Sequence, residues 1–541
     1  MSCTLTPESV NVGVIGSHLY TTMEKFSAYK QNKRAALAVH PMLRCPVLYG
    51  ISFDGVAISG ITMEFVKLAH CYHSRGYKIF LDLGYDIKPD KQRFLRPYGD
   101  EVTVLPCWIQ PTRSANLESL ASYNRDVIQK TLRRGFGWRS KGGGNGSASV
   151  TRVIAEIANR IVRTWQSLGV TMVVVENGTL PENVIFTWAL YRAIYQYGRK
   201  MKLGKYVLWR DHDIMWFCEP EKYGRPPYPA HIHRPTPSPY ICYAALTSSA
   251  ARTISEWAGG TPIEIIPNCF EFRRTTQEPK GFREAYSIPK DAFVIARCTR
   301  VIPQKRIDRE ILLLKLLGQI AASRGFKRRF HLVITGPTDE NPEEFHLLKR
   351  LACSLGLKAQ VHFSNGLLSP HFNGSADKRR YSIPDLLGEA DLSSFLTSYR
   401  YEGFGNPPGE ACAYGVPFIS STYELYDAVY GSKGLRALLF PITQEDDGHP
   451  SEAWAAELFE RISDERRMRA DADFNFECAR SHFSLEAIER KLMTLFPHHF
   501  AGDGRLPARY AQVQSERGYD EHTHTGETEP KGDSRLPSGA R

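Results

Sequence analysis

The chain has 541 residues, of which 42% are hydrophobic, 23% charged and 11% aromatic. These proportions exclude a collagen-like, coiled-coil or wholly disordered chain, and the length predicts two large domains with additional tails. The formal net charge of +11 favours an anionic partner: nucleic acid, a membrane surface or a phosphorylated small molecule.

Eleven cysteines lie singly along the chain without CxxC pairs, which is typical of a reducing compartment. No segment matches a secretory signal peptide or reaches the roughly 18 apolar residues of a membrane-spanning helix, so we expect a cytoplasmic protein. Three segments differ in composition from packed structure. We interpret residues 1–40 as an N-terminal extension, 135–149 as a flexible loop and 502–541 as a disordered tail.

The first half alternates short β-rich runs with amphipathic helical ones, which predicts a parallel sheet with helical crossovers. Strands are expected at 47–52, 78–83, 102–105, 171–175, 206–210 and 241–247. Helices are expected at 61–74, 117–134, 152–168 and 183–199, because apolar residues recur there at three-to-four spacing.

The same alternation restarts after a polar, proline-containing linker at 268–289. Strands are expected at 293–296, 331–335, 361–363, 392–397 and 416–419. We therefore predict an α/β protein of two Rossmann-like domains, 41–267 and 290–482, that face each other across a cleft. A terminal helix at 483–498 is expected to cross back to the first domain and brace the hinge.

The most informative stretch is YEGFGNPPGEACAYGVP at 401–417, which lies between two predicted strands. Its glycines let the backbone approach a ligand closely, and Pro407 and Pro408 suit the first turn of a short helix whose free N–H groups bind anions and hydroxyls. Glu402 at the strand exit and Glu410 in the first helical turn can reach one bound ligand.

This stretch resembles the E-x7-E signature of retaining GT-B glycosyltransferases of the large family that includes sucrose synthases, glycosyltransferase family 4. TRVIPQK at 299–305 resembles the arginine and lysine segment of that family, and VITG at 333–336 resembles its next strand end. The resemblance implies that Arg300 and Lys305 hold the donor diphosphate. It further implies that Glu410 binds the donor ribose and that Glu402 binds the transferred sugar.

The donor contacts that the resemblance implies are Gly60, Gly336, Gly403, Phe404, Gly405, Asn406, Pro407, Pro408 and Glu410. GISFDGVAISG at 50–60 ends a predicted strand and opens a helix, like the glycine loop of the family near the diphosphate and acceptor. Asp54 in this loop is a candidate acceptor contact. An ordinary strand-to-helix turn explains the same residues equally well.

WRDHDIMW at 209–216 follows another predicted strand, at a place where the family often has a histidine near the reacting sugar. His212 is the candidate that donates to this sugar, Asp213 fixes its orientation, and Arg210 addresses the acceptor. A solvated turn is the alternative. Asn177 in ENGTLP also leaves a strand, and the two segments together faintly resemble the mannosylglucosylglycerate synthase subgroup.

The resemblance implies a retaining transferase that moves a hexose from GDP-mannose or UDP-glucose to a hydroxyl of a small or sugar-like acceptor. His212, Arg300, Lys305 and Glu402 are its candidate catalytic residues. We expect no metal or cofactor, no nucleic acid and no membrane span, with peripheral membrane contact left open. The alternative is a polyanion-binding or nucleic-acid-binding α/β protein without transferase activity, which would use the basic segment 125–141.

Overall fold

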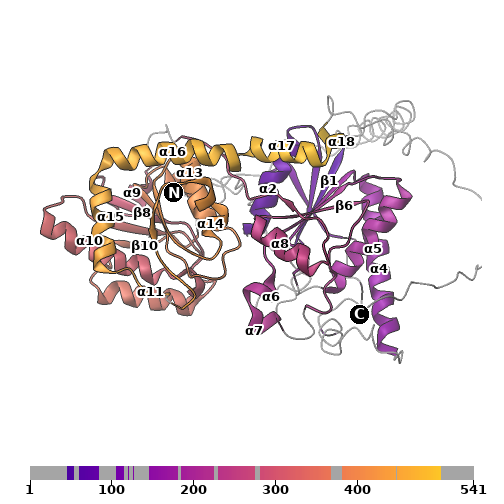
Figure 1. Ribbon diagram of the computed structural model, residues 1–541, viewed down its shortest axis with the longest axis horizontal. Helices are drawn as coiled ribbons and strands as arrows, with labels where there is room; N and C mark the ends of the chain where they lie inside the picture. The colour runs from indigo at the N-terminus through magenta and orange to yellow at the C-terminus, as the bar shows by residue number, and fades with distance from the viewer. Residues whose placement is uncertain are drawn as a thin grey trace, which may run out of the picture. The chain divides into compact units, whose positions relative to one another are not determined.

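The computed structural model describes residues 45–53, 60–83, 105–114, 120, 126, 145–180, 184–224, 229–274, 281–366, 381–445 and 447–500. Within these residues the chain forms a seven-stranded and a six-stranded sheet (Figure 1). Every pair of neighbouring strands in both sheets is parallel. The predicted α/β class with two parallel sheets is therefore confirmed.

The first sheet has the strand order β3-β2-β1-β4-β5-β6-β7. Its strands are β1 (Val47–Ser52), β2 (Lys78–Asp82), β3 (Ile109–Thr112), β4 (Met172–Glu176), β5 (Val207–Asp211), β6 (Ile241–Ala245) and β7 (Glu264–Ile265). The helices of this part are α2 (Gly60–His73), α4 (Asn145–Leu168), α5 (Val184–Lys200), α6 (Met215–Cys218), α7 (Pro220–Tyr223) and α8 (Ser248–Trp257).

Both faces of this sheet are covered, which explains why its central strands are continuous apolar runs. Tyr49 and Val173 pack in the core under α4 and α5. Leu48 and Val174, one position away in each strand, pack on the opposite face against α2. Successive strand residues therefore enter different cores, as a pleated strand requires.

Two differences from the predicted elements have local causes. β3 was not predicted, because IQPT lacks the alternation of a half-buried strand and contains Pro111. It is an edge strand, where a missing N–H is tolerated. α4 begins at Asn145, inside the segment expected to be a loop, although its first residues NGSAS include the poor helix formers Asn, Gly and Ser. The strand expected at 102–105 and the helix expected at 117–134 lie outside the described residues, apart from residues 105, 120 and 126.

The second sheet has the strand order β10-β9-β8-β11-β12-β13. Its strands are β8 (Phe293–Arg297), β9 (Phe330–Ile334), β10 (Val361–Phe363), β11 (Leu392–Phe395), β12 (Phe418–Ser421) and β13 (Leu438–Phe440). The helices around it are α9 (Phe282–Ala285), η5 (Pro303–Lys305), α10 (Asp308–Arg324), α11 (Pro342–Ser354), α12 (Ile383–Leu387), α13 (Asn406–Tyr414), α14 (Tyr426–Val429), η6 (Gly431–Lys433), α15 (Glu452–Ser463) and α16 (Glu465–Phe483). The stretch predicted as a linker contains α9.

The chain ends its described part with α17 (Leu485–Leu495) and α18 (Pro497–Phe500). Ser484 caps α17 by accepting a hydrogen bond from the backbone N–H of Ala487 at 3.2 Å. Ile488 and Leu492 on α17 belong to the core that contains α2, and α17 lies beside α2 (Figure 1). The consecutive helices α16 and α17 thus connect the second sheet to the first. The predicted limits of the two domains stay a prediction.

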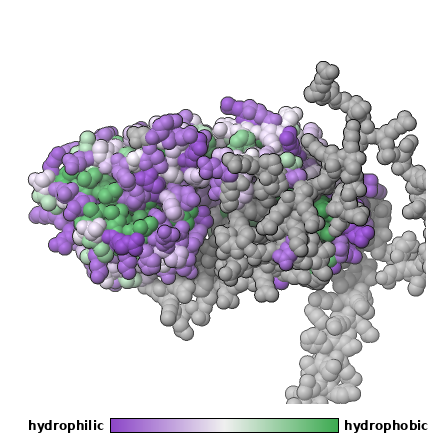
Figure 2. Space-filling model, turned by 90° about the horizontal axis from the view of Figure 1, so that it is seen from below, coloured by the Kyte–Doolittle hydropathy of each residue, from purple (hydrophilic) through white to green (hydrophobic). Residues whose placement is uncertain are grey.

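The described helices include none that is long and apolar enough to cross a membrane. Where the face in Figure 2 shows described residues, hydrophilic side chains surround smaller hydrophobic areas. This distribution is ordinary for the surface of a folded α/β protein.

Candidate active site

Glu402 lies in the loop that leaves β11, and two groups hold its carboxylate. Glu402 Oε1 is 2.5 Å from Lys305 Nζ and accepts a hydrogen bond from Thr397 Oγ1 at 2.7 Å. Both charged side chains are largely buried, with 7% and 16% of the side chain exposed. Tyr401, just before, has a φ of 80°, a strained backbone for a non-glycine residue. The structure therefore brings two of the predicted catalytic residues into direct contact.

The loop then passes so close to the first sheet that glycine is needed. A Cβ added to Gly403 would overlap Asp213 Oδ1 and lie 2.8 Å from the backbone oxygen of His212. At Gly405, where φ is 79°, a Cβ would lie 2.5 Å from Tyr423 Oη. The glycines are thus explained by packing within the protein, and the Glu402 loop lies against the His212 segment.

α13 follows with an unusual first turn. Pro407 and Pro408 are buried and have no N–H, so this turn offers fewer donors than the helix terminus that the sequence suggested. Phe404 also points into the core, where its ring packs against Phe270 and Tyr430. Only the backbone of Phe404 is left to contact a ligand.

Asn406 and Glu410 on α13 face two charged residues of α2 that sequence reasoning missed. Asn406 Nδ2 donates to Glu64 Oε1 at 3.2 Å, and Lys67 Nζ lies 2.5 Å from the same oxygen. Burial raises the pKa of Glu410 to about 7, with Lys67 opposing and Glu64 reinforcing the shift. Asn406 Oδ1 also accepts from Asn268 Nδ2 at 2.9 Å. A charged pair within the apolar helix ITMEFVKLAH was the available signal for this contact.

Arg300 does not join Lys305 in this structure. Its guanidinium Nη1 lies 2.8 Å from Glu340 Oε1, and 57% of its side chain is exposed. The backbone around Arg300 packs on Gly336, where a Cβ would lie 2.5 Å from the backbone oxygen of Thr299. The role of Arg300 at the diphosphate therefore stays a prediction, and it requires the side chain to leave Glu340.

His212 is held at the carboxyl end of β5 by a buried acid. Its Nε2 lies 2.7 Å from Glu176 Oε2, at the end of β4. Asn177, with a φ of 60°, accepts hydrogen bonds through Oδ1 from the backbone N–H groups of His212 at 3.0 Å and Asp213 at 3.2 Å. These contacts fix the segment as a structured turn, in contrast to the solvated turn that we considered.

Arg210 is fully buried behind His212, where it forms two hydrogen bonds to Glu176, at 2.9 and 3.1 Å. Burial alone would raise the pKa of Glu176, but Arg210 and His212 outweigh it and lower that pKa. The guanidinium thus contacts Glu176, and its predicted contact with an acceptor is untested. Next to it, burial raises the pKa of Asp211 to about 6.

For the remaining candidate residues of the first half, the structure shows no contact among the described residues that would support a role in the site. Gly60 is exposed at the start of α2, with nothing within 4 Å of an added Cβ. Asp54 lies outside the described residues, as does the basic segment 125–141 apart from residue 126. Within the described ranges, no group of three or more His, Cys, Asp or Glu side chains is arranged to hold a metal ion.

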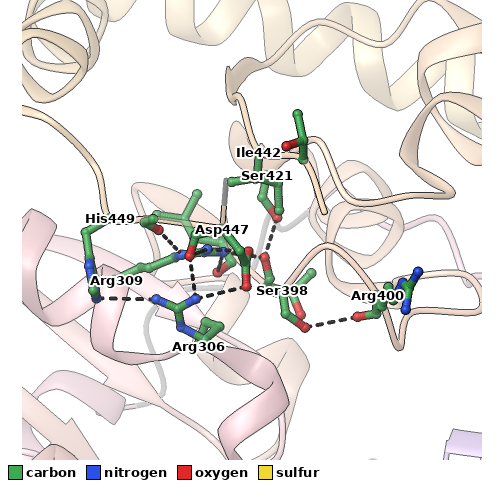
Figure 3. A network of polar contacts seen from close by, with 12 residues as sticks. Arg306, Arg309, Ser398, Arg400, Ser421, Ile442, Asp447 and His449 are labelled. Carbon is green, nitrogen blue, oxygen red and sulfur yellow. Dashed lines mark hydrogen bonds and ion pairs between the residues drawn. The ribbon is translucent and has the colours of Figure 1, made fainter. Parts of the chain in front are cut away.

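Figure 3 shows a polar network that includes Arg306, Arg309 and Asp447. Arg309 is fully buried and donates through Nη1 to the backbone oxygen of Thr397 at 2.6 Å. The backbone oxygen of Asp447 accepts at 2.7 Å from Arg306 and at 2.7 Å from Arg309. Arg306 directly follows Lys305 and has a φ of 48°. The network therefore fixes the turn after Lys305 and the strand end that carries the Thr397 hydroxyl.

Comparison with known proteins agrees with this geometry. The family model for glycosyl transferases group 1 matches residues 280–447, which include Arg300, Lys305, Glu402 and Glu410. Residues 280–447 therefore match a glycosyltransferase family model, and the chain has two parallel α/β sheets in a GT-B-like fold.

Solved structures share the fold at low sequence identity. A glycosyltransferase from Rickettsia africae ESF-5 is 15% identical, with a TM-score of 0.53 over 85% of this chain and 100% of that chain. Sucrose-phosphate synthase from Thermosynechococcus elongatus is 14% identical, with a TM-score of 0.53 over 84% and 99%. Anabaena HepE in complex with UDP and glucose is 15% identical, with a TM-score of 0.52 over 84% and 100%. No curated protein sequence matches the chain.

Proposed function

We propose that this enzyme is a retaining hexosyltransferase that uses UDP-glucose or GDP-mannose and a hydroxyl of a small or sugar-like acceptor. The observation that carries this proposal is the close packing of Gly403 against His212 and Asp213. Because of this packing, the loop that holds the ion pair of Glu402 and Lys305 lies beside the segment that holds His212. Groups of this kind, converging from separate segments, are typical of an active site.

On the donor side, the ion pair of Lys305 and Glu402 is the resting arrangement. A bound diphosphate would attract the Lys305 ammonium, and Glu402 would then be free to accept hydrogen bonds from the sugar hydroxyls. Arg300 is exposed and long enough to exchange Glu340 for the same diphosphate. Two cations near the departing phosphate would stabilise the negative charge that develops on it.

On the sugar side, the contact with Glu176 determines which ring nitrogen of His212 is available to a substrate. The ionised carboxylate accepts a hydrogen bond from Nε2, so Nε2 carries a proton. Nδ1 is the ring nitrogen left for a sugar hydroxyl: it accepts a hydrogen bond from the hydroxyl in the neutral ring and donates one, as the sequence suggested, in the protonated ring. Arg210 keeps Glu176 ionised and acts through it as a positioning residue.

In the transfer itself, the acceptor oxygen forms a bond to the anomeric carbon on the face that the nucleotide leaves. The bond from that carbon to the phosphate oxygen breaks, and the leaving phosphate takes the proton of the acceptor hydroxyl. The products are a glycoside of retained configuration and a nucleoside diphosphate.

The test is nucleoside diphosphate release from purified protein with UDP-glucose and, separately, GDP-mannose. UDP-glucose is tried first because the Anabaena structure of the same fold holds UDP and glucose. Lys305→Ala should slow release by about 100- to 1,000-fold, whereas Lys327→Ala, which removes an exposed lysine elsewhere in the same half, should leave it unchanged. Equal release by both variants would contradict the donor site. A product of inverted anomeric configuration would contradict the retaining mechanism.

A further inference from the structure

A cavity of about 760 Å³ lies on the first sheet's helical layer, between α4, α5 and the residues before β6. The side chains that line it include Trp188, Tyr191, Arg192, Tyr195, Arg199 and His233. A volume of this size is typical of a ligand pocket.

The cavity is separate from the candidate active site. His212 follows the carboxyl end of β5, whereas Tyr240, which also lines the cavity, immediately precedes the amino end of β6. α5 connects two parallel strands and so runs back from the carboxyl edge of the sheet toward its amino edge. Arg199, near the end of α5, therefore lies toward the amino edge of the sheet, whereas His212 lies at the carboxyl edge.

The lining of α5 alternates aromatic and cationic side chains. Trp188, Arg192, Tyr195 and Arg199 are spaced by four, three and four residues, which places them on one face of the helix. They extend over about 16 Å, at about 1.5 Å per residue. Such a stripe suits an elongated ligand that offers flat faces and negative charges in turn.

The aromatic side chains are held rigidly. The ring of His233 stacks on Tyr191 with centroids 3.6 Å apart and meets Trp188 edge-on at 4.4 Å. Trp188 Nε1 donates to the backbone oxygen of His231 at 2.8 Å. Burial lowers the pKa of His233 to about 4, so this wall is uncharged at neutral pH. Fixed rings bind a flat apolar face without the entropic cost of being ordered.

The charged side chains among the described lining residues are all positive. Arg192 and Arg199 are exposed and form no ion pair among the described residues, and none of the described lining side chains is acidic. Gln196 Oε1, also in the lining, is buried and has no hydrogen-bond partner in the part of the chain that the structure describes. A ligand with anionic groups and hydroxyl donors would satisfy all three side chains.

We propose that this cavity is a second, noncatalytic binding site for an anionic oligosaccharide, whose sugar rings stack on the exposed ring of Tyr195 and the partly exposed rings beside it, and whose carboxylate or phosphate groups pair with Arg192 and Arg199. Single-stranded nucleic acid also uses aromatic rings and cations. The match of residues 280–447 to a sugar-transferring family favours the saccharide. The inference rests on the class of enzyme and is independent of the donor sugar.

The experiment compares the binding of tetragalacturonate, maltotetraose and a short oligothymidylate by calorimetry at low salt. We expect tetragalacturonate to bind more tightly than the other two. Arg192→Gln combined with Arg199→Gln should weaken it at least about tenfold, because two charge-assisted contacts are lost. Tyr195→Ser should also weaken it, since 38% of this residue is exposed and open for stacking.

Arg252→Gln on α8 is the matched control, because it removes an exposed arginine from the same half of the chain, and it should bind as the unmodified enzyme does. The proposal is overturned if the double variant binds tetragalacturonate unchanged, if no saccharide binds, or if the oligothymidylate binds most tightly. Thermal stabilisation by UDP and by GDP is measured in the same variants. It should be unchanged, which separates failure of this site from failure of the donor site.

Discussion

Glu176 Oε2 lies 2.7 Å from His212 Nε2, and the same carboxylate is bonded to the fully buried Arg210. The three side chains come from the ends of two adjacent parallel strands, β4 and β5. Glu176 therefore balances a buried cation and fixes the tautomer of the histidine at once.

Glu176→Gln should lower both stability and turnover. The uncompensated Arg210 should cost about 3 kcal/mol of unfolding free energy, as is typical when a buried pair loses one partner. Loss of the fixed tautomer should reduce kcat more than it raises the donor KM, and should change the pH profile of kcat. Glu264→Gln, an exposed glutamate in the same half, is the control. An unchanged kcat and an unchanged pH profile of kcat would contradict a role of His212 in the reaction.

Lys305→Ala should reduce kcat by about 100- to 1,000-fold, because a cation that stabilises the leaving diphosphate is lost. Folding should be retained, which circular dichroism would check. Arg300→Ala should change stability by less than about 0.5 kcal/mol, since its ion pair with Glu340 is largely exposed. A strong loss of activity in Arg300→Ala is expected only if this side chain leaves Glu340 during the reaction.

The ionisation of Glu410 should couple nucleotide binding to pH. Burial raises the pKa of Glu410 to about 7, so between its unfolded value of 4.5 and about 7 the folded chain binds more protons than the unfolded chain. Its contribution to stability is therefore greatest at acid pH and falls as pH rises through 7. Glu410→Gln should remove this part of the pH dependence, as followed by chemical denaturation at pH 5, 6, 7 and 8.

The carboxylate is also the stronger hydrogen-bond acceptor for ribose hydroxyls. The affinity of the unmodified enzyme for nucleoside diphosphate should thus increase from pH 6 to pH 8, and that of Glu410→Gln should not follow it. Parallel pH dependence in both proteins would show that Glu410 does not contact the nucleotide.

Gly403→Ala should destabilise the enzyme by about 1–3 kcal/mol, because the added methyl would overlap Asp213. It should also separate the Glu402 loop from His212 and lower kcat. Gly318→Ala is the matched control, since an added Cβ there meets nothing within 4 Å in the exposed middle of α10. That substitution should stabilise by about 0.5–1 kcal/mol. Normal kcat in Gly403→Ala would argue against a shared site.

Local patterns were sufficient for much of the fold. The buried parallel strands are continuous apolar runs, which the sequence shows directly. The spacing of Arg300, Lys305, Glu402 and Glu410 identified the segment that the family model matches, residues 280–447. β3 was not predicted because this short edge strand buries only Ile109 among its four residues and shows no alternation.

What the sequence alone determined was therefore the class of fold and the segment that matches a glycosyltransferase family model, since both follow from periodicity and spacing within a short window. Only the tertiary structure decided which side chains meet. Lys305 and Glu402 are 97 residues apart, and Asn406 and Glu64 are 342 apart. The partner of a charge depends on how the sheets and helices pack, and no local pattern encodes that Arg210 contacts Glu176 or that Arg300 contacts Glu340.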